Sequence, residues 1–298
     1  MIVAVTGATG FVGRAVVDRA AGSGLSLRAL TRRAQPSRAG LTWIAGALDK
    51  PESLATLVEG ADAVLHIAGV VSAPDREGFV AGNIDGTRAM VEAAKAAGIK
   101  RFVHVSSLSA REPELSVYGW SKRQAEIVVQ NSGLDWTIVR PSGIYGPHDT
   151  EWLDMFRTAR LGLAFMPPPG KLSLIAVEDF ARLLTTLVAT DGPRAVLEVD
   201  DGQVLTHADL AAAIGAAVGQ RVMTLHLPKA LLSLGAKIDR SFRGNGAKLT
   251  PDRVGYLCHP DWTADPARRP DPALWEPAIV LSKGLADTAR WYRANGLL

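Results

Sequence analysis

Cysteine is nearly absent from this 298-residue chain, and long uncharged apolar runs are missing altogether. The single cysteine, Cys258, excludes a disulfide within the chain and any cysteine-based metal cluster. The six histidines are scattered and form no zinc-ligand spacing, so we expect no metal site. Because no uncharged apolar stretch approaches the roughly 18 residues of a membrane span, we expect a cytoplasmic protein with no membrane partner.

Clusters of like charge are also lacking. Lysine and arginine total 33 against 30 acidic residues, which leaves a net charge of +3. The densest basic spots, Arg32-Arg33 and Arg268-Arg269, are too small for a nucleic-acid footprint, so no nucleic-acid partner is expected. A composition of 47% hydrophobic and 21% charged residues is typical of a globular protein, and it excludes a disordered, collagenous or coiled-coil chain.

The chain does contain a regular alternation of short apolar runs and helix-length segments. This alternation predicts repeated βα units, and therefore an α/β fold with a doubly wound parallel sheet. The expected strands of this sheet are residues 2–6, 25–30, 42–45, 63–67, 101–105, 136–140 and 195–199. The expected helices between them are residues 11–21, a helix that begins at 51, 85–97, 118–130 and 179–189.

After residue 147 the rhythm changes, which indicates a second domain. The remaining expected elements are 172–177, a helix over 206–217, a strand over 221–225, a loop over 242–246 and a helix over 281–294. The chain therefore divides into residues 1–148 with 174–200, and a smaller mixed α/β domain of 149–173 with 201–298. The first residues form a strand pattern rather than a signal peptide.

Three glycines span the turn from the first strand into the first helix, in the run Gly7-Ala8-Thr9-Gly10-Phe11-Val12-Gly13. Glycines let the chain turn tightly and let a pyrophosphate approach the backbone, and the helix N-terminus supplies unpaired N–H groups. A purely structural turn is the alternative. The position within the first βα unit favours a dinucleotide loop. The predicted cofactor contacts in this loop are Gly7, Thr9, Gly10, Phe11, Val12 and Gly13.

The end of the second strand distinguishes NAD from NADP in such a fold. An acidic residue there accepts hydrogen bonds from the ribose 2′-OH, whereas arginine pairs with a 2′-phosphate. This chain has Arg32 and Arg33 at that point, and no acidic residue nearby. A solvated basic turn is the alternative. We expect NADP, with NAD less favoured.

A tyrosine and a lysine four residues apart, Tyr118 and Lys122, share one face of a predicted helix. A nearby ammonium favours the phenolate, so such a tyrosine can exchange a proton with a carbonyl or alcohol oxygen while hydride moves at a nicotinamide. The spacing alone also arises by chance. Its position supports the prediction, because Ser107 follows the strand 101–105, where a hydroxyl can hold the substrate oxygen.

These motifs resemble the extended short-chain dehydrogenase/reductases, also called the NAD-dependent epimerase/dehydratase superfamily, and most closely the dihydroflavonol-reductase and hydroxysteroid-dehydrogenase-like members. The segments that carry the resemblance are Thr6–Gly13, Asp62–Gly69, Asn83–Thr87, Val105–Ser107, Tyr118–Glu126 and Arg140–Pro147. The resemblance implies a dinucleotide-binding Rossmann domain followed by a substrate-binding domain. It also implies a homodimer, formed through the helices that begin near Asp85 and Tyr118.

Carried over by position, the resemblance makes Ser107, Tyr118 and Lys122 the catalytic residues, with Tyr118 and Lys122 also at the cofactor. It adds six further cofactor contacts, namely Leu48, Ala68, Gly69, Asn83, Pro141 and Ile144. One departure is Ala47, where relatives often carry an aspartate that bonds adenine. Leu48 beside it keeps the apolar contact.

Three functions agree with these residues. The first is an NADP-dependent oxidoreductase of a ketone or secondary alcohol. The second is a nucleotide-sugar epimerase with bound NAD; a sugar dehydratase is disfavoured because Leu108-Ser109 stand where dehydratases carry Asp-Glu. The third is a non-catalytic NADP-binding protein, although such relatives usually lose the tyrosine or the lysine. The substrate is therefore a small carbonyl or alcohol, or a sugar nucleotide. Apolar side chains such as Phe156 and Phe165 favour a hydrophobic ketone, and ordinary core packing is the alternative for each of them.

Overall fold

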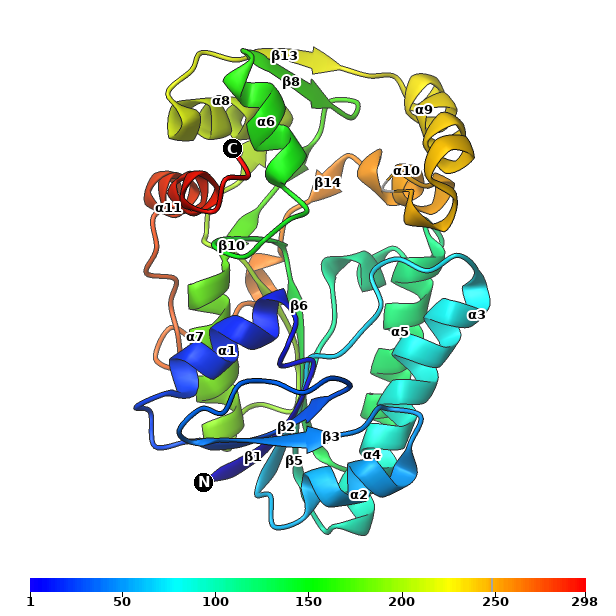
Figure 1. Cartoon of the computed structure of the whole chain (residues 1–298), viewed down its shortest axis with the longest axis vertical. Helices are drawn as coiled ribbons and strands as arrows, with labels where there is room; N and C mark the ends of the chain where they lie inside the picture. Colours follow the sequence, from blue (N-terminus) through cyan, green and yellow to red (C-terminus); the bar gives the residue numbers. More distant parts are fainter. Residues whose placement is uncertain (248) are drawn as a thin grey trace. The chain divides into compact units, whose positions relative to one another are not determined.

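The computed structural model describes residues 1–247 and 249–298, which form two compact units (Figure 1). The first unit comprises Met1–Pro141, Phe180–Glu198 and Arg268–Glu276. The second comprises Ser142–Asp179, Val199–Ala267 and Pro277–Leu298. These bounds differ from the expected division. Residues 142–148, 174–179 and 199–200 group with the second unit, and residues 268–276 group with the first.

The first unit is built on a seven-stranded sheet with the order β11-β6-β5-β4-β1-β2-β3. Its strands are β1 (Ile2–Thr6), β2 (Ser26–Thr31), β3 (Leu41–Ala45), β4 (Ala63–His66), β5 (Arg101–Val105), β6 (Asp135–Pro141) and β11 (Val196–Val199). The pairs β1–β2, β1–β4, β2–β3, β4–β5 and β5–β6 are parallel. Central strands such as β4 are buried along their whole length, which explains their continuous apolar sequences. The predicted parallel sheet is confirmed.

Helices cover both faces of this sheet, so the fold is doubly wound (Figure 1). The helices on one face are α2 (Pro51–Val58), α4 (Gly86–Ala96) and α5 (Val117–Gln130), and those on the other are α1 (Phe11–Ala20) and α7 (Val177–Ala189). A core that includes Leu54, Leu57, Met90 and Phe102 fills the space between α2, α4 and the sheet. Three short segments complete the unit, namely α3 (Arg76–Phe79), the π-helical η1 (Val80–Asp85) and the 3₁₀ turn η2 (Leu108–Arg111).

The second unit is a smaller mixture of helices and short strands, as expected. Its strands are β7 (Gly143–Tyr145), β8 (Leu163–Met166), β9 (Lys171–Leu172), β10 (Leu174–Ala176), β12 (Leu205–Thr206), β13 (Met223–His226) and β14 (Asp261–Trp262). Its helices are α6 (Leu153–Arg160), α8 (His207–Val218), α9 (Lys229–Arg243), α10 (Pro251–Leu257) and α11 (Leu281–Ala294), with 3₁₀ turns η3 (Gly244–Gly246) and η4 (Pro266–Arg268). The core includes Phe156 and Tyr292, whose rings meet edge to face at 5.1 Å.

Two expected elements of the second unit are wrong. The run 172–177 is divided at Ser173, because Ser173 pairs with Trp262 and Ala264 instead of continuing the strand. The expected loop at 242–246 is helical throughout, since Phe242 and Arg243 are the last residues of α9 and the next three residues form η3. In the described ranges, none of the helices is long and apolar enough to cross a membrane.

Candidate active site

The strand order reverses between β1 and β4, and the loops after these two strands lie against each other. Gly7 follows β1 with φ +79°, a left-handed conformation that glycine adopts without strain. A Cβ on Gly7 would lie 2.6 Å from the Ala68 nitrogen, so only glycine fits there. The Ala68 N–H donates to Thr6 Oγ1 at 3.2 Å and joins the two loops. In open α/β sheets this reversal point is where ligands bind.

The glycine loop packs tightly against the start of helix α1. A Cβ on Gly13 would lie 2.1 Å from the Gly7 carbonyl oxygen, so the start of α1 is pressed directly onto the loop. Helix α1 begins at Phe11 after Gly10, which has no side chain to cap the first N–H groups. Thr9 and Gly10 are exposed. These residues would hold the phosphates of a dinucleotide on backbone N–H groups at the helix N-terminus.

Replacing Gly13 by alanine should weaken NADPH binding by at least about tenfold, because the loop must move away from the new methyl group. Gly235 in α9 provides a matched control, since a Cβ there meets Leu249 only at an ordinary 3.5 Å. Gly235→Ala should leave NADPH affinity unchanged and raise the melting temperature slightly. Fluorescence titration and thermal unfolding measure both effects. Unchanged affinity and melting temperature in Gly13→Ala would contradict this description of the loop.

The basic residues after β2 are at the surface. Arg32 and Arg33 are exposed, and the Thr31 hydroxyl donates to the Arg33 carbonyl at 2.6 Å, which fixes the turn. Arg38, further along, pairs with Asp18 at 2.6 Å. The structure therefore leaves Arg32 and Arg33 facing solvent, where a 2′-phosphate could approach them.

Asn83 lies in the π-helical segment η1, and its side chain is 1% exposed. Its Oδ1 accepts from the Val70 N–H at 2.6 Å, and its Nδ2 donates to the Val70 carbonyl at 2.9 Å and to Ser121 Oγ at 2.8 Å. Asn83 therefore fixes the loop after β4 to helix α5. Irregular π-helical turns of this kind are frequent at functional sites.

Lys122 is the buried cation of this region, with 4% of its surface exposed. Its Nζ donates to the Val105 carbonyl at 2.7 Å. Burial lowers the pKa of Lys122 to about 8, and the negative charge of Glu126 opposes that shift. A Cβ on Gly69 would lie 3.5 Å from Lys122 Nζ and 3.1 Å from Asn83 Oδ1. Three sequence-predicted residues, Gly69, Asn83 and Lys122, are thus brought together.

Ser107 and Tyr118 each lie at the start of a helical segment. Ser107 is half-buried and caps η2, where its Oγ accepts from the Ser109 N–H at 3.1 Å. Ser116 caps α5, so Tyr118 occupies the first turn of that helix, one turn before Lys122. The Tyr118 ring is half-buried and lies 6.3 Å from the ring of Phe79.

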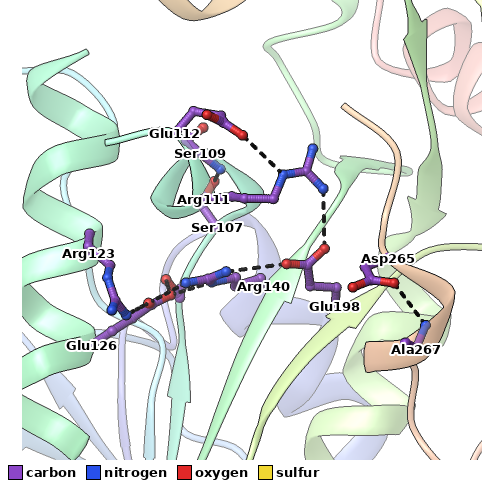
Figure 2. Close-up of polar contacts among 11 residues, drawn as sticks. Ser107, Ser109, Arg111, Glu112, Arg123, Glu126, Arg140, Glu198, Asp265 and Ala267 are labelled. Atoms are coloured by element: carbon purple, nitrogen blue, oxygen red, sulfur yellow. Dashed lines mark hydrogen bonds and ion pairs between the residues drawn. The ribbon is translucent and has the colours of Figure 1, made fainter. Parts of the chain in front are cut away.

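A buried ion network, which the sequence did not indicate, joins Glu126, Arg140 and Glu198 (Figure 2). Arg140 donates to both carboxylate oxygens of Glu126, at 2.8 and 2.7 Å, and to Glu198 Oε1 at 3.2 Å. Ser106 Oγ donates to Glu126 Oε1 at 2.6 Å, and Arg111 lies 3.4 Å from Glu198 Oε2. Burial alone would lower the pKa of Arg140, but the two carboxylates raise it overall.

This network connects the elements that carry the candidate catalytic residues. Glu126 is one turn beyond Lys122 on α5, and Ser106 immediately precedes Ser107. Arg111 is the last residue of η2, the turn that Ser107 caps. The network therefore fixes α5 and the loop after β5 to the strands β6 and β11.

Three further predicted cofactor residues belong to other parts of the chain. Leu48 packs against the start of α4, since a Cβ on Gly86 would lie 2.8 Å from Leu48 Cδ1. Pro141 is buried at the end of β6, and Ile144 lies half-buried in β7 of the second unit. Phe156, one of the apolar side chains that favoured a hydrophobic ketone, packs in the core of the second unit and is fully buried.

The sequence and fold match known proteins. A family model described as NAD(P)H-binding matches residues 7–163. A ceramide reductase from Caulobacter vibrioides is 36% identical over 100% of this chain and 96% of its own length. A 4-hydroxy-2-methyl-3-oxo-4-farnesyl-3,4-dihydroquinoline-1-oxide ketoreductase from Stigmatella aurantiaca is 35% identical over 52% of this chain and 55% of its own.

A solved structure shares the fold. The Bordetella bronchiseptica enzyme WbmG in complex with NAD and UDP has a TM-score of 0.77 and 17% identity, covering 99% of this chain and 96% of that one. The family model spans more than half of the chain, and the first relative spans all of it. The chain therefore belongs to the NAD(P)H-binding family as an extended short-chain dehydrogenase/reductase, and it is an NAD(P)-dependent oxidoreductase of that type.

Proposed function

We propose that this chain is an NADP-dependent oxidoreductase that transfers a hydride between nicotinamide and a ketone or secondary alcohol. The observation that carries the proposal is the buried ammonium of Lys122, one turn from Tyr118 and beside Gly69 and Asn83. In this proposal the first unit binds the dinucleotide, the second contributes substrate-binding residues, and the chain forms a homodimer through α4 and α5.

In the reductive direction a bound nicotinamide would supply the hydride that reduces the carbonyl carbon. The Tyr118 hydroxyl donates its proton to the carbonyl oxygen, and the alcohol leaves with that proton. The Lys122 ammonium stabilises the resulting phenolate. The Ser107 hydroxyl donates a hydrogen bond to the same substrate oxygen and stabilises the charge that develops there.

We propose a hydrophobic ketone as the substrate. The whole-length relative is named a ceramide reductase, and a second relative is a ketoreductase of a farnesyl-bearing compound. The nucleotide-sugar epimerase remains the second candidate, because a neighbour of the same fold binds NAD and UDP. Two features weigh against it, namely Arg32 after β2 and the sequence Ser173-Leu174 where nucleotide-sugar enzymes often carry Arg-Asp.

Parallel titration with NADPH and NADH tests the cofactor. NADPH should bind at least about tenfold more tightly, or about 1.4 kcal/mol, and Arg32→Ala should remove most of that preference. Arg38→Ala is the matched control, because Arg38 is already paired with Asp18. A preference for NADH, or an NAD that cannot be stripped from the protein, would favour the epimerase.

The rate of ketone reduction should fall as the pH rises through about 8, the pKa of Lys122. Above that pH the ammonium loses its proton, and the positive charge that assists proton transfer from Tyr118 is lost. The measurement is the initial rate of NADPH oxidation with a long-chain ketone across the neutral and alkaline range. A rate that does not change through pH 8 would show that the charge of Lys122 does not assist proton transfer. Turnover of UDP-glucose in place of the ketone would support the epimerase.

A further inference from the structure

Helix α9 follows β13 in the chain (Figure 1) and exposes a row of large apolar side chains to solvent. Its members are Leu231 (54% exposed), Leu234 (54%), Ile238 (49%) and Phe242 (86%). Their spacing of three and four residues places all of them on one side of the helix. Ala236, on the other side, is fully buried, and α9 packs against α10 and η3. We refer to these four residues as the α9 stripe.

The charge of α9 is strongly positive. The helix carries four basic residues, Lys229, Lys237, Arg240 and Arg243, and one acidic residue, Asp239. Asp239 is largely buried, pairs with Arg243 at 3.3 Å and accepts from the Leu249 N–H. Lys237 and Arg240 are exposed. The exposed surface of α9 therefore carries an apolar stripe on one side and the positive charges of Lys237 and Arg240 on another.

A second apolar face lies just before α9 in the chain. Strands β8 and β13 are parallel, with Leu163 opposite Met223 and Phe165 opposite Leu225, so these four apolar side chains share one face. Phe165 is 48% and Met223 is 57% exposed. The exposed residues Arg160 and Arg221 flank the two strands. Only Leu227 and Pro228 separate β13 from α9.

We propose that the α9 stripe, together with the outward face of β8 and β13, docks on the surface of an anionic lipid bilayer. An amphipathic helix that carries large apolar residues on one face and basic residues on its polar face suits the interface between headgroups and acyl chains. The basic residues complement anionic headgroups. A helix of 15 residues is too short to span a bilayer, so the chain lies on the surface.

This inference goes beyond the proposed function and does not depend on it. We expected no membrane partner because the sequence has no long apolar run. Only a membrane-spanning helix needs such a run, and a helix that lies in the membrane interface does not. Surface docking would bring a hydrophobic ketone dissolved in the bilayer within reach of the enzyme. The two proposals are separable, because vesicle binding is measured without substrate.

The test is co-sedimentation of the full chain with vesicles of phosphatidylcholine alone and with about 30 mol% phosphatidylglycerol added. We expect binding to the anionic vesicles that weakens at high salt. Phe242→Ser and Leu234→Ser should each reduce that binding by at least about tenfold. Lys237→Glu should also reduce binding to the anionic vesicles, and this reduction should be largest at low salt. Val280→Ser is the matched control, because Val280 is 62% exposed but lies outside both apolar faces.

The substituted side chains are exposed, so the variants should fold, and their unchanged reduction of a water-soluble ketone would verify this. Equal binding by Phe242→Ser and Val280→Ser would overturn the proposal, as would no binding to either vesicle. A change in sedimentation coefficient in the stripe variants, without vesicle binding, would show that the stripe joins copies of this chain or another protein instead. Vesicle binding without any ketone turnover would refute the proposed function only.

Discussion

Replacing Tyr118 by phenylalanine is expected to reduce ketone reduction by about a thousandfold or more while NADPH affinity stays within about twofold. The substitution removes one hydroxyl and keeps the ring that lies beside Phe79. The helix start is set by Ser116, and Lys122 keeps its hydrogen bond to Val105, so the local structure should persist. What disappears is the proton that must reach the substrate oxygen as hydride arrives. Single-turnover kinetics and fluorescence titration measure the two quantities.

Tyr145→Phe is the matched control for this experiment. The Tyr145 hydroxyl is buried and has no hydrogen-bond partner among the described residues, so its removal should cost little stability and little activity. A Tyr118→Phe variant that keeps full turnover would exclude Tyr118 as the proton donor. Loss of NADPH binding together with activity would mean instead that the hydroxyl supports the cofactor site.

The sheet of the first unit could be predicted from the sequence because its signals are local. Strands β1 and β5 and helix α11 have the predicted bounds. Each strand is a short run of apolar residues that ends at a glycine or a polar turn. Similarly, the face that Leu281, Leu285 and Tyr292 share on α11 is buried, as the helical period indicates.

Helix α9 was not predicted, although its sequence carries a usable signal. The residues Leu231, Leu234, Ile238 and Phe242 recur with a helical period. Two features obscure the pattern, namely Gly235 inside the helix and Pro228 at its start, which offers no side-chain cap. The apolar side chains also face solvent, so the helix is not part of the apolar core that sequence patterns usually reveal.

The ion network around Arg140 could not be predicted, because its members are distant in the sequence. Glu126, Arg140 and Glu198 come from α5, β6 and β11, and they meet only because β6 lies between β5 and β11. Nothing in the sequence indicates that these three charges pair with one another. Burial of two carboxylates and a guanidinium with mutual hydrogen bonds is a property of the assembled sheet.

Replacing Glu126 by glutamine should lower the free energy of unfolding by about 3 kcal/mol, because it breaks the buried pair with Arg140 and leaves that charge to Glu198 alone. The same substitution should move the alkaline loss of ketone reduction to lower pH. The Glu126 charge raises the pKa of Lys122, so removing it lets burial lower that pKa further below about 8. Denaturant unfolding and the pH dependence of the rate measure the two effects.

Glu92→Gln is the matched control, because Glu92 makes an exposed pair with Lys95 at 3.4 Å. Its unfolding free energy should change by less than about 0.5 kcal/mol, and its pH profile should stay unchanged. If Glu126→Gln lowers the stability but leaves the pH profile unchanged, the network stabilises the fold and has no effect on the reaction. If the alkaline loss of activity moves to lower pH, Glu126 also affects the reaction, through the charge of Lys122. Equal, small effects in both variants would contradict a buried ion pair at Glu126.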